Sequence, residues 1–312
     1  KVFITIKPFY GPYVPDSIKN NLNTMLRKYS VAGIVTEIQD LKYLFIEVDV
    51  NAYYNPSLAS NADAVKTIVV DNINKYADSA EMNKYGARFK YSKFQGIIDN
   101  SNQSITSNIT KVEIRRDMQP RLGQRVEYEL CFGNPFYIKN NNGYNIKSSG
   151  FNVFGIADTV YMSDKPNANR RTGKIFLFKL QSKSGPVIVS NNVGTIDYQK
   201  GEIMLDAINV TGTSKKVQDV PIIEVSACPE SNDVIGLQDL YLQLDSSNST
   251  VDMVSDVISS GANTAGNLYT ATSSYISGDI ARLTETESLN TNLTQSDTYI
   301  LGTTTNPSSS TY

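Results

Sequence analysis

The sequence predicts an α+β fold that is followed by an antiparallel β-rich region and an extended C-terminal arm. Three observations support this prediction. Residues 1–118 mix strand-like alternation with helical apolar spacing, residues 119–245 hold β-rich runs separated by turns, and residues 246–312 are about half Ser, Thr and Asn. With 312 residues, 40% of them hydrophobic, the chain can bury a core in more than one domain. We therefore expect three parts with these boundaries.

The first part begins with a strand and an amphipathic helix. Val2–Lys7 alternates as a half-buried strand does, and Pro8 and Gly11 end it. Asp16 suits the N-cap of a helix, because its carboxylate can accept hydrogen bonds from free backbone N–H groups. The apolar residues that follow have helical spacing: Ile18, Leu22, Met25, Leu26 and Tyr29.

Two more strands, two helices and a closing strand complete this part. The strands are expected at Ile34–Gln39 and Tyr43–Asn51, and the last one at Ile105–Arg116. Ser60 and Asp63 resemble a capping box at the start of a helix that continues to Tyr76. A short helix carries Phe94, Ile97 and Ile98. The order β-α-β-β-α-(α)-β matches a ferredoxin-like split βαβ motif with one inserted helix.

The second part reads as an antiparallel sandwich or barrel. Val193–Tyr198 and Glu202–Val210 flank a three-residue loop that contains Gly201, which suits a hairpin. In the third part, Val254, Val257 and Ile258 have helical spacing, as do Ile276, Ile280 and Leu283. These stripes are too thin to stand alone. We expect an arm that packs on the folded body or on a neighbouring copy.

The composition removes most catalytic and metal chemistry. The chain contains no His, which excludes Ser-His and Cys-His pairs. Cys131 and Cys228 are far apart in the sequence and read as buried free thiols. Carboxylate pairs such as Asp197 with Glu202, or Glu113 with Glu127 or Glu129, are interpreted as solvated strand faces. We predict no catalytic residue, no cofactor and no metal site.

Charge and aromatic residues favour a protein partner. A net charge of −2 leaves no electrostatic footprint for nucleic acid, and no apolar run reaches the roughly 20 residues of a membrane span. The basic cluster Lys111, Arg115, Arg116, Arg121 and Arg125 is interleaved with acids. This pattern favours a mixed ion-paired surface at a domain junction or a subunit contact over a nucleic-acid groove.

Phe3, Tyr43 and Phe45 are expected on one open sheet face of the first part, where the β-rich region or another subunit should cover them. An RNA-recognition module, which stacks bases on such rings, is the sharper alternative, but Glu47 and Asp49 on the same face oppose it. Aromatic residues are enriched at protein interfaces. The candidate protein-interface residues are Phe3, Tyr43, Phe45, Val254, Val257, Ile258, Ile276, Ile280 and Leu283.

One stretch resembles a known family. The run from Leu41 to Asp99 has a strand ending in VDV, a Tyr-Asn-Pro turn, a long amphipathic helix, a Gly-containing loop and a YSKF-type short helix, and ITKVEIRRD follows. This pattern, over about residues 1–118, is similar to the baseplate J-like family of contractile-tail proteins. The chain begins at Lys1, without an initiator Met or a signal peptide, and is expected to be a C-terminal fragment.

The resemblance implies a structural role in a virion. Members of the family form homodimers within a baseplate wedge, join other wedge subunits and link the wedges into a ring around the tail hub, after assembly in the host cytoplasm. The family has no enzymatic activity and no cofactor, so it implies no catalytic residue here. The alternative from another class is a tail-associated hydrolase or adhesin, which would show a cleft with converging acids.

Overall fold

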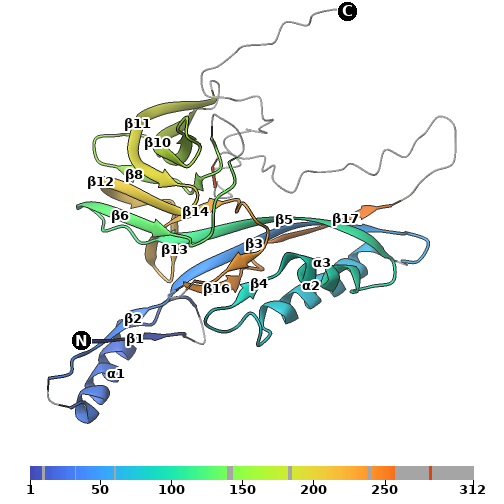
Figure 1. Cartoon of the computed structure of the whole chain (residues 1–312), viewed down its shortest axis with the longest axis horizontal. Helices are drawn as coiled ribbons and strands as arrows, with labels where there is room; N and C mark the ends of the chain where they lie inside the picture. Colours follow the sequence, from blue (N-terminus) through green and yellow to red (C-terminus); the bar gives the residue numbers. More distant parts are fainter. Residues whose placement is uncertain are drawn as a thin grey trace, which may run out of the picture.

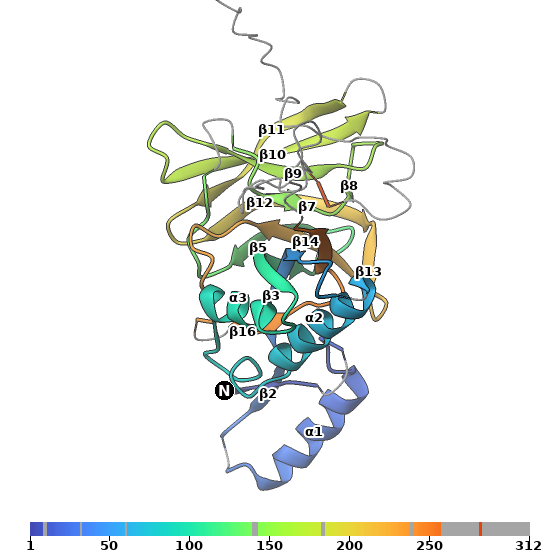
Figure 2. The same cartoon turned by 90° about the vertical axis from the view of Figure 1, so that its right-hand side faces the viewer.

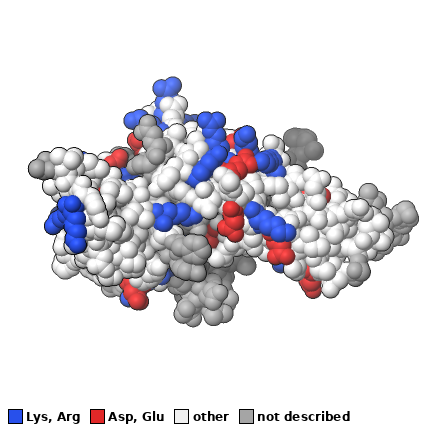
Figure 3. Space-filling model, turned by 90° about the horizontal axis from the view of Figure 1, so that it is seen from below, with Lys and Arg blue, Asp and Glu red and all other residues white. Residues whose placement is uncertain are grey.

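Two β-sheets and two helices form three layers, and a small N-terminal unit projects from them (Figures 1 and 2). The computed structural model describes residues 1–8, 11–31, 33–59, 61–138, 143–181, 185–237, 240–256 and 281–282. A seven-stranded sheet lies in the middle, with the six-stranded sheet on one side of it and the two helices α2 and α3 on the other. On the face seen from below, acidic and basic side chains are interspersed (Figure 3).

The N-terminal unit is a βαβ element with its own sheet. It contains β1 (Val2–Ile6), α1 (Asp16–Tyr29) and β2 (Thr36–Asp40). The two strands pair in parallel, from Val2 opposite Thr36 to Ile6 opposite Asp40. Because parallel strands need a crossover connection, the helix joins them. No residue of α1 is fully buried.

The seven-stranded central sheet collects strands from distant parts of the chain. Its strands follow the order β13-β14-β5-β3-β16, with β17 on β3 and β7 on β14. Their bounds are β3 (Lys42–Tyr54), β5 (Ile105–Met118), β7 (Lys147–Ser148), β13 (Lys215–Val217), β14 (Val220–Ala227), β16 (Leu240–Leu244) and β17 (Thr250–Ser255). β3 and β5 are antiparallel, whereas β16 and β17 add in parallel, one after the other, along β3.

Helices α2 (Ala62–Ala77) and α3 (Tyr91–Asp99) cover one face of the central sheet. The Asn61 side chain caps α2 by accepting a 2.9 Å hydrogen bond from the Asp63 N–H, so Asn61 rather than Ser60 is the cap. The buried side of α2 carries Val65, Val69, Ile73 and Tyr76. A small ladder of β4 (Arg88–Phe89) and β15 (Val234–Ile235) closes this end.

The six-stranded sheet is the expected antiparallel β-rich region. It contains β6 (Arg125–Cys131), β8 (Phe151–Val153), β9 (Tyr161–Pro166), β10 (Thr172–Gln181), β11 (Gly185–Asp197) and β12 (Glu202–Thr213). The expected hairpin is present, because β11 pairs with β12 from Gly194 to Asp197. Gly201 has φ +67°, and a Cβ there would lie 2.0 Å from the Asn134 carbonyl oxygen. Only glycine fits this turn without rearrangement.

The ferredoxin-like start is not observed, although the broader α+β class is. That motif places its four strands in one sheet, whereas β1 pairs with β2 in a sheet of its own. The strand β5 has β14 as its second neighbour, and β3 has β16 and β17. The alternation in Val2–Ile6 specifies a strand but not its partner. The central sheet therefore draws strands from all three expected parts, and the three-part division stays a prediction.

The start of the expected arm is a strand rather than a helix. Val254 lies in β17 opposite Tyr53, because the free edge of β3 offers backbone partners to this segment. The other five candidate arm residues lie outside the described part of the chain: Val257, Ile258, Ile276, Ile280 and Leu283. Further along, Ala281 and Arg282 are described and contact the folded body.

A pair of isoleucines on α2 tests the packing of this layer. Ile73 is 3% exposed in the core, whereas Ile68 is 39% exposed on the same helix. We expect Ile73→Ala to lower the free energy of unfolding by about 2–5 kcal/mol, because it leaves a cavity. The matched Ile68→Ala change should cost less than about 1 kcal/mol. Urea unfolding measures both, and equal losses would contradict this packing of α2.

Candidate functional site: a buried ion-pair network on the central sheet

The centre of the network is Arg115, which β5 places between two neighbouring strands. In the sheet, Arg115 lies opposite Phe45 on β3 and opposite Ser226 on β14. Cross-strand neighbours share a face of the sheet, so the Arg115 guanidinium lies over the Phe45 ring at 4.4 Å from its centroid. Arg115 is only 4% exposed. A charge this deep requires partners.

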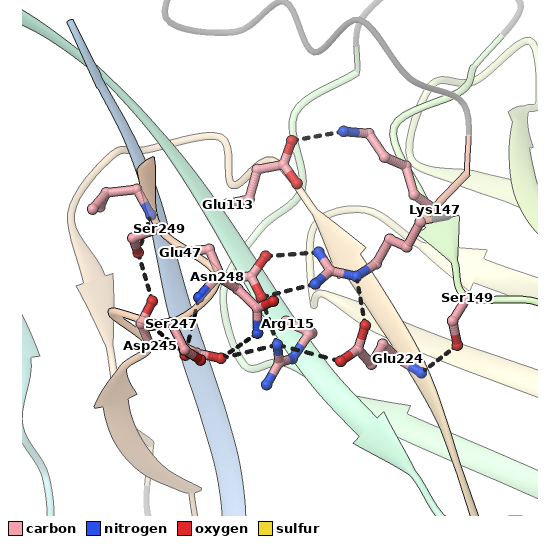
Figure 4. Close-up of polar contacts among 12 residues, drawn as sticks. Glu47, Glu113, Arg115, Lys147, Ser149, Glu224, Asp245, Ser247, Asn248 and Ser249 are labelled. Carbon is pink, nitrogen blue, oxygen red and sulfur yellow. Dashed lines mark hydrogen bonds and ion pairs between the residues drawn. The ribbon is translucent and has the colours of Figure 1, made fainter. Parts of the chain in front are cut away.

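Four carboxylates surround the Arg115 guanidinium, and Figure 4 shows those of Glu47, Glu224 and Asp245. Its Nη1 donates to Glu47 Oε1 at 2.6 Å, and it lies 3.0 Å from Asp245 Oδ2 and 3.5 Å from Glu224 Oε1. Its Nε lies 3.0 Å from Asp117 Oδ1, yet neither atom makes a well-aligned hydrogen bond. The partners come from β3, β5, β14 and the end of β16, so one side chain connects four strands.

A second arginine reaches the same carboxylates from far along the chain. Arg282 Nη1 and Nη2 donate to the two oxygens of Glu47 at 2.6 and 2.9 Å, and its Nε donates to Glu224 Oε2 at 3.1 Å. This two-pronged geometry is the strong form of an arginine–carboxylate pair. The Arg282 backbone N–H also donates to the Ser148 carbonyl at 2.9 Å. Arg282 therefore bridges β3 and β14.

Neutral side chains fix the carboxylates from behind. Asp245 accepts hydrogen bonds from the backbone N–H and hydroxyl of Ser247 and from Asn248. Ser249 Oγ donates to the Asp245 carbonyl at 2.6 Å and accepts from the Val48 N–H at 3.1 Å. These bonds join the loop after β16 to the middle of β3. The Asp245 carboxylate is thereby held in place toward Arg115 (Figure 4).

Two lysines complete the set of charges. Lys147 Nζ donates to Glu113 Oε1 at 2.7 Å, and the Lys147 side chain is 9% exposed. Lys215 Nζ lies 2.8 Å from Glu224 Oε2. Glu113 stands directly opposite Glu47 across β3 and β5. Like charges directly opposite each other on paired strands repel, and the lysine and arginine partners offset that repulsion.

The surroundings move the pKa values of these acids in opposite directions. Burial raises the pKa of Asp117 to about 6, against the lowering effect of Arg115 and with a further raising effect from Glu224. Burial also raises the pKa of Glu224, but Arg282, Arg115 and Lys215 outweigh it, so the pKa of Glu224 lies below its ordinary value. Asp117 is thus the acid that its partners compensate least.

The network suits a mechanical role better than a chemical one. Each carboxylate faces a cation or a donor, and a buried ion pair contributes little net stability compared with apolar packing. Such pairs instead penalise alternative arrangements in which one member is left unpaired. In the described part of the chain, no cluster of three His, Cys, Asp or Glu side chains is placed to hold a metal ion. We infer that the network fixes strand partners and register.

The structure separates the three predicted aromatic interface residues. Tyr43 and Phe45 are buried with Leu41 and Tyr241, whereas Phe3 is 57% exposed on the separate β1–β2 sheet. Phe3, Tyr43 and Phe45 therefore do not form one open aromatic platform. The arrangement of an RNA-recognition module, which needs such a platform, is absent at these residues. The reason is that β16 brings Tyr241 against Tyr43, with ring centroids 5.9 Å apart.

The predicted acids have different surroundings from those expected. Asp197 and Glu202 do pair across the hairpin, and Asp197 accepts two hydrogen bonds from the turn N–H groups of Gln199 and Lys200. Glu113 does not face Glu127 or Glu129, because β6 belongs to the other sheet. Its partner is Lys147, so the interpretation of Glu113 as a solvated surface charge was wrong.

The ion-paired junction expected of the basic cluster is present at Arg115, whereas Arg121 and Arg125 are exposed. Cys228 is buried and Cys131 is half-buried, which corrects the expectation for Cys131. The residue that sequence reasoning missed is Arg282. Its signal was available, because Arg282 is the only basic residue among residues 246–312.

Part of the central sheet and its helices is similar to known proteins. Residues 42–117 match the family described as baseplate structural protein gp6, C-terminal domain III. Over this stretch the chain is therefore similar to a domain of a phage baseplate structural protein. It resembles the baseplate wedge protein gp6 of Enterobacteria phage T4, with 23% identity over 118 residues. That similarity covers 38% of this chain and 18% of the T4 protein.

The match supports the sequence-based resemblance to contractile-tail baseplate proteins. The matched residues hold β3, α2, α3 and nearly all of β5. They include Glu47, Arg115 and Asp117, while the partners Glu224, Asp245 and Arg282 lie outside them. The matched domain therefore contributes one half of the network, and the later chain contributes the other half.

Asp117 gives the network a testable pH dependence. A folded-state pKa of about 6, above the ordinary 3.8, means that protonation favours the folded state. This stabilisation is complete below about pH 4 and is lost as the pH rises through about 6. Relative to Asp117→Asn, the wild type should therefore lose about 1–3 kcal/mol of unfolding free energy between pH 4 and 7.

Urea unfolding at several pH values measures this difference. The matched variant is Asp197→Asn, which changes a half-buried turn carboxylate outside the network. It should keep the wild-type pH profile in this range. An Asp117→Asn protein that follows the wild-type curve at every pH would show that Asp117 does not carry the effect.

Arg282 should contribute far more to the free energy of unfolding than an exposed basic residue does. Arg282→Ala leaves Glu47 and Glu224 short of a partner, and breaking a buried pair in this way costs about 3–5 kcal/mol. Arg282→Lys keeps the charge but not the two-pronged contact, so its stability should lie between those of the wild type and Arg282→Ala. The exposed Arg121→Ala is the control, with an expected loss within about 0.5 kcal/mol. Thermal unfolding ranks the three, and a neutral Arg282→Ala would contradict the network.

Proposed function

We propose that this chain is a non-catalytic structural subunit that self-associates and joins other wedge subunits into a ring around the tail hub. What supports self-association is an exposed apolar surface on the N-terminal unit. Among the described residues of the segment 1–35, eight large apolar side chains are exposed: Val2, Phe3, Ile18, Met25, Tyr29, Val31, Ile34 and Val35. We call this set the N-terminal apolar surface. Such a concentration usually marks an interaction site.

Helix α1 provides the most ordered part of this surface. Ile18, Met25 and Tyr29 lie seven and four residues apart, so they follow one stripe of the helix. Tyr29 is 83% exposed. The sheet below α1 has only two strands and leaves this stripe uncovered. Apolar residues at these intervals lie on one face, which can pack against a second helix with the same stripe.

Strand β1 provides a matching backbone edge. Among the described residues, β1 pairs only with β2, and a two-stranded sheet is marginal without further strands or packing. Pairing with β1 of a second copy around a two-fold axis makes a four-stranded sheet and brings both α1 helices to the same face. A two-fold contact of this kind uses the same surface on both subunits. The occupant that we propose is therefore a second copy of this chain.

The distribution of charge favours a protein partner over nucleic acid or membrane. Acidic and basic side chains alternate on the face in Figure 3, without a broad field of one sign. The described helices include none long and apolar enough to cross a membrane. The acids proposed for a hydrolase are engaged elsewhere, Asp197 in its turn and Glu113 with Lys147. No observation favours the hydrolase or adhesin alternative.

Charge placed on the α1 stripe tests this proposal. The double change Met25→Glu and Tyr29→Glu should disrupt self-association, because buried carboxylates would repel across the two-fold axis. Sedimentation velocity should show the wild type as a concentration-dependent dimer and the variant at least tenfold weaker. Phe154→Glu, at another strongly exposed apolar residue far from α1 in the sequence, is the control and should associate normally.

Two results would count against this surface. One is a wild type that stays monomeric at high concentration, in which case the N-terminal apolar surface serves a different subunit. The other is a dimer that the α1 variant leaves unchanged, which would move the contact elsewhere. The dimer contact itself should bury more than about 1,000 Å².

A further inference from the structure

The contact of Ala281 and Arg282 with the body has the form of a peptide-binding site. Arg282 enters between Glu47 and Glu224, its backbone N–H binds Ser148, and it forms a parallel bridge with Ser149. Ala281 is 4% exposed and packs with Tyr161, Phe176 and Phe178. A backbone contact combined with side-chain subsites is how proteins recognise extended peptides. We call these seven body residues, Glu47, Ser148, Ser149, Tyr161, Phe176, Phe178 and Glu224, the Arg282 socket.

The carboxylates in and beside the Arg282 socket need the positive charge of Arg282. The carboxylates of Glu47, Asp117, Glu224 and Asp245 face three cations, those of Arg115, Lys215 and Arg282. Without Arg282, two cations remain for four carboxylates. The Arg282 side chain is 13% exposed, so the socket opens to the protein surface. An arginine can therefore enter it from solvent.

The chain between the body and Arg282 is long compared with the distance it must cover. The Asp256 N–H donates to the Tyr54 carbonyl at one end of β3, and Glu47 lies seven residues back along the same strand. That separation is about 23 Å along a strand. From Asp256 to Ala281 the chain runs 25 residues, which can extend to about 80 Å. Its length does not restrict Arg282 to the socket of its own chain.

We propose that the Arg282 socket is exchangeable and that in the assembled baseplate it takes Ala281 and Arg282 of a second copy. The contacts are the same whether the arginine belongs to the same chain or to its neighbour, so exchange costs no interaction. This is the physical basis of segment swapping between identical subunits. The inference rests on the proposed self-association, which holds two copies in one assembly and so raises the effective concentration of each arginine for the other copy's socket.

The test mixes two full-length variants that each lack one half of the contact. A tagged chain carries Arg282→Ala and keeps the socket. An untagged chain carries Glu47→Gln and Glu224→Gln and keeps Arg282, since the amides preserve size but remove charge. Capture on the tag measures how much untagged chain is retained. In the control pair, the untagged chain also carries Arg282→Ala.

Exchange predicts at least threefold more retention in the first pair than in the control, together with a rise in the thermal midpoint of the tagged chain. Equal retention in the two pairs, or no retention in either, overturns the proposal. The same experiment in the Met25→Glu, Tyr29→Glu background separates this inference from the proposed function. Loss of the N-terminal contact lowers the retention in both pairs, whereas loss of exchange removes only the difference in retention between them. If the double amide variant fails to fold by circular dichroism, Glu224→Gln alone replaces it.

Discussion

The central sheet depends on the need of one buried guanidinium for carboxylate partners. Arg115 lies in the middle of the sheet with almost no access to water, and the acids that face it are supplied by β3, β14 and the turn after β16. Leaving a buried charge unpaired costs several kcal/mol, so arrangements that omit any of these strands are disfavoured. The charge network thus specifies the fold, while the apolar side of the sheet supplies most of the stability through contact with α2 and α3.

This constraint explains why the matched gp6 domain is not a complete sheet by itself. Strands β3 and β5 lie inside the matched residues, and they present Glu47 and Arg115 to partners that follow much later in the chain. The six-stranded sheet is inserted between β5 and β14 in sequence order. The described residues of the N-terminal unit make their ion pairs within that unit, outside the network.

Sequence patterns located most elements but not their partners. The hairpin of β11 and β12 was predictable because its turn and its strands are adjacent. The two helices after β3 were predictable because their apolar spacing is local. The pairing of β3 with β16 and β17 was not, since alternation in Tyr43–Asn51 shows which side chains share a face and nothing about the neighbouring strand. For the same reason Phe3 was assigned to the wrong sheet.

The site was only partly predictable. The mixture of Arg115 with nearby acids indicated an ion-paired junction, and this proved correct. The surroundings of Glu47 and Glu113 could not be predicted, because both have the alternating pattern of surface acids. In the structure Glu47 is buried against Arg282, and Glu113 is half-buried against Lys147. Arg282 stood out by composition as a lone cation in a polar arm. Assigning its partners required the three-dimensional contact, because 235 residues separate it from Glu47.

Two features are central: a rigid central sheet held by the network, and a self-association surface on the N-terminal unit. Hydrogen–deuterium exchange of the whole protein at low and at high concentration tests both at once. We expect β3, β5, β14 and β16 to be equally protected at both concentrations, and residues 2–35 to gain protection only at the higher one. Exchange that is fast in β14 and β16, or protection that rises in β9–β12 instead of the N-terminal unit, would contradict the account.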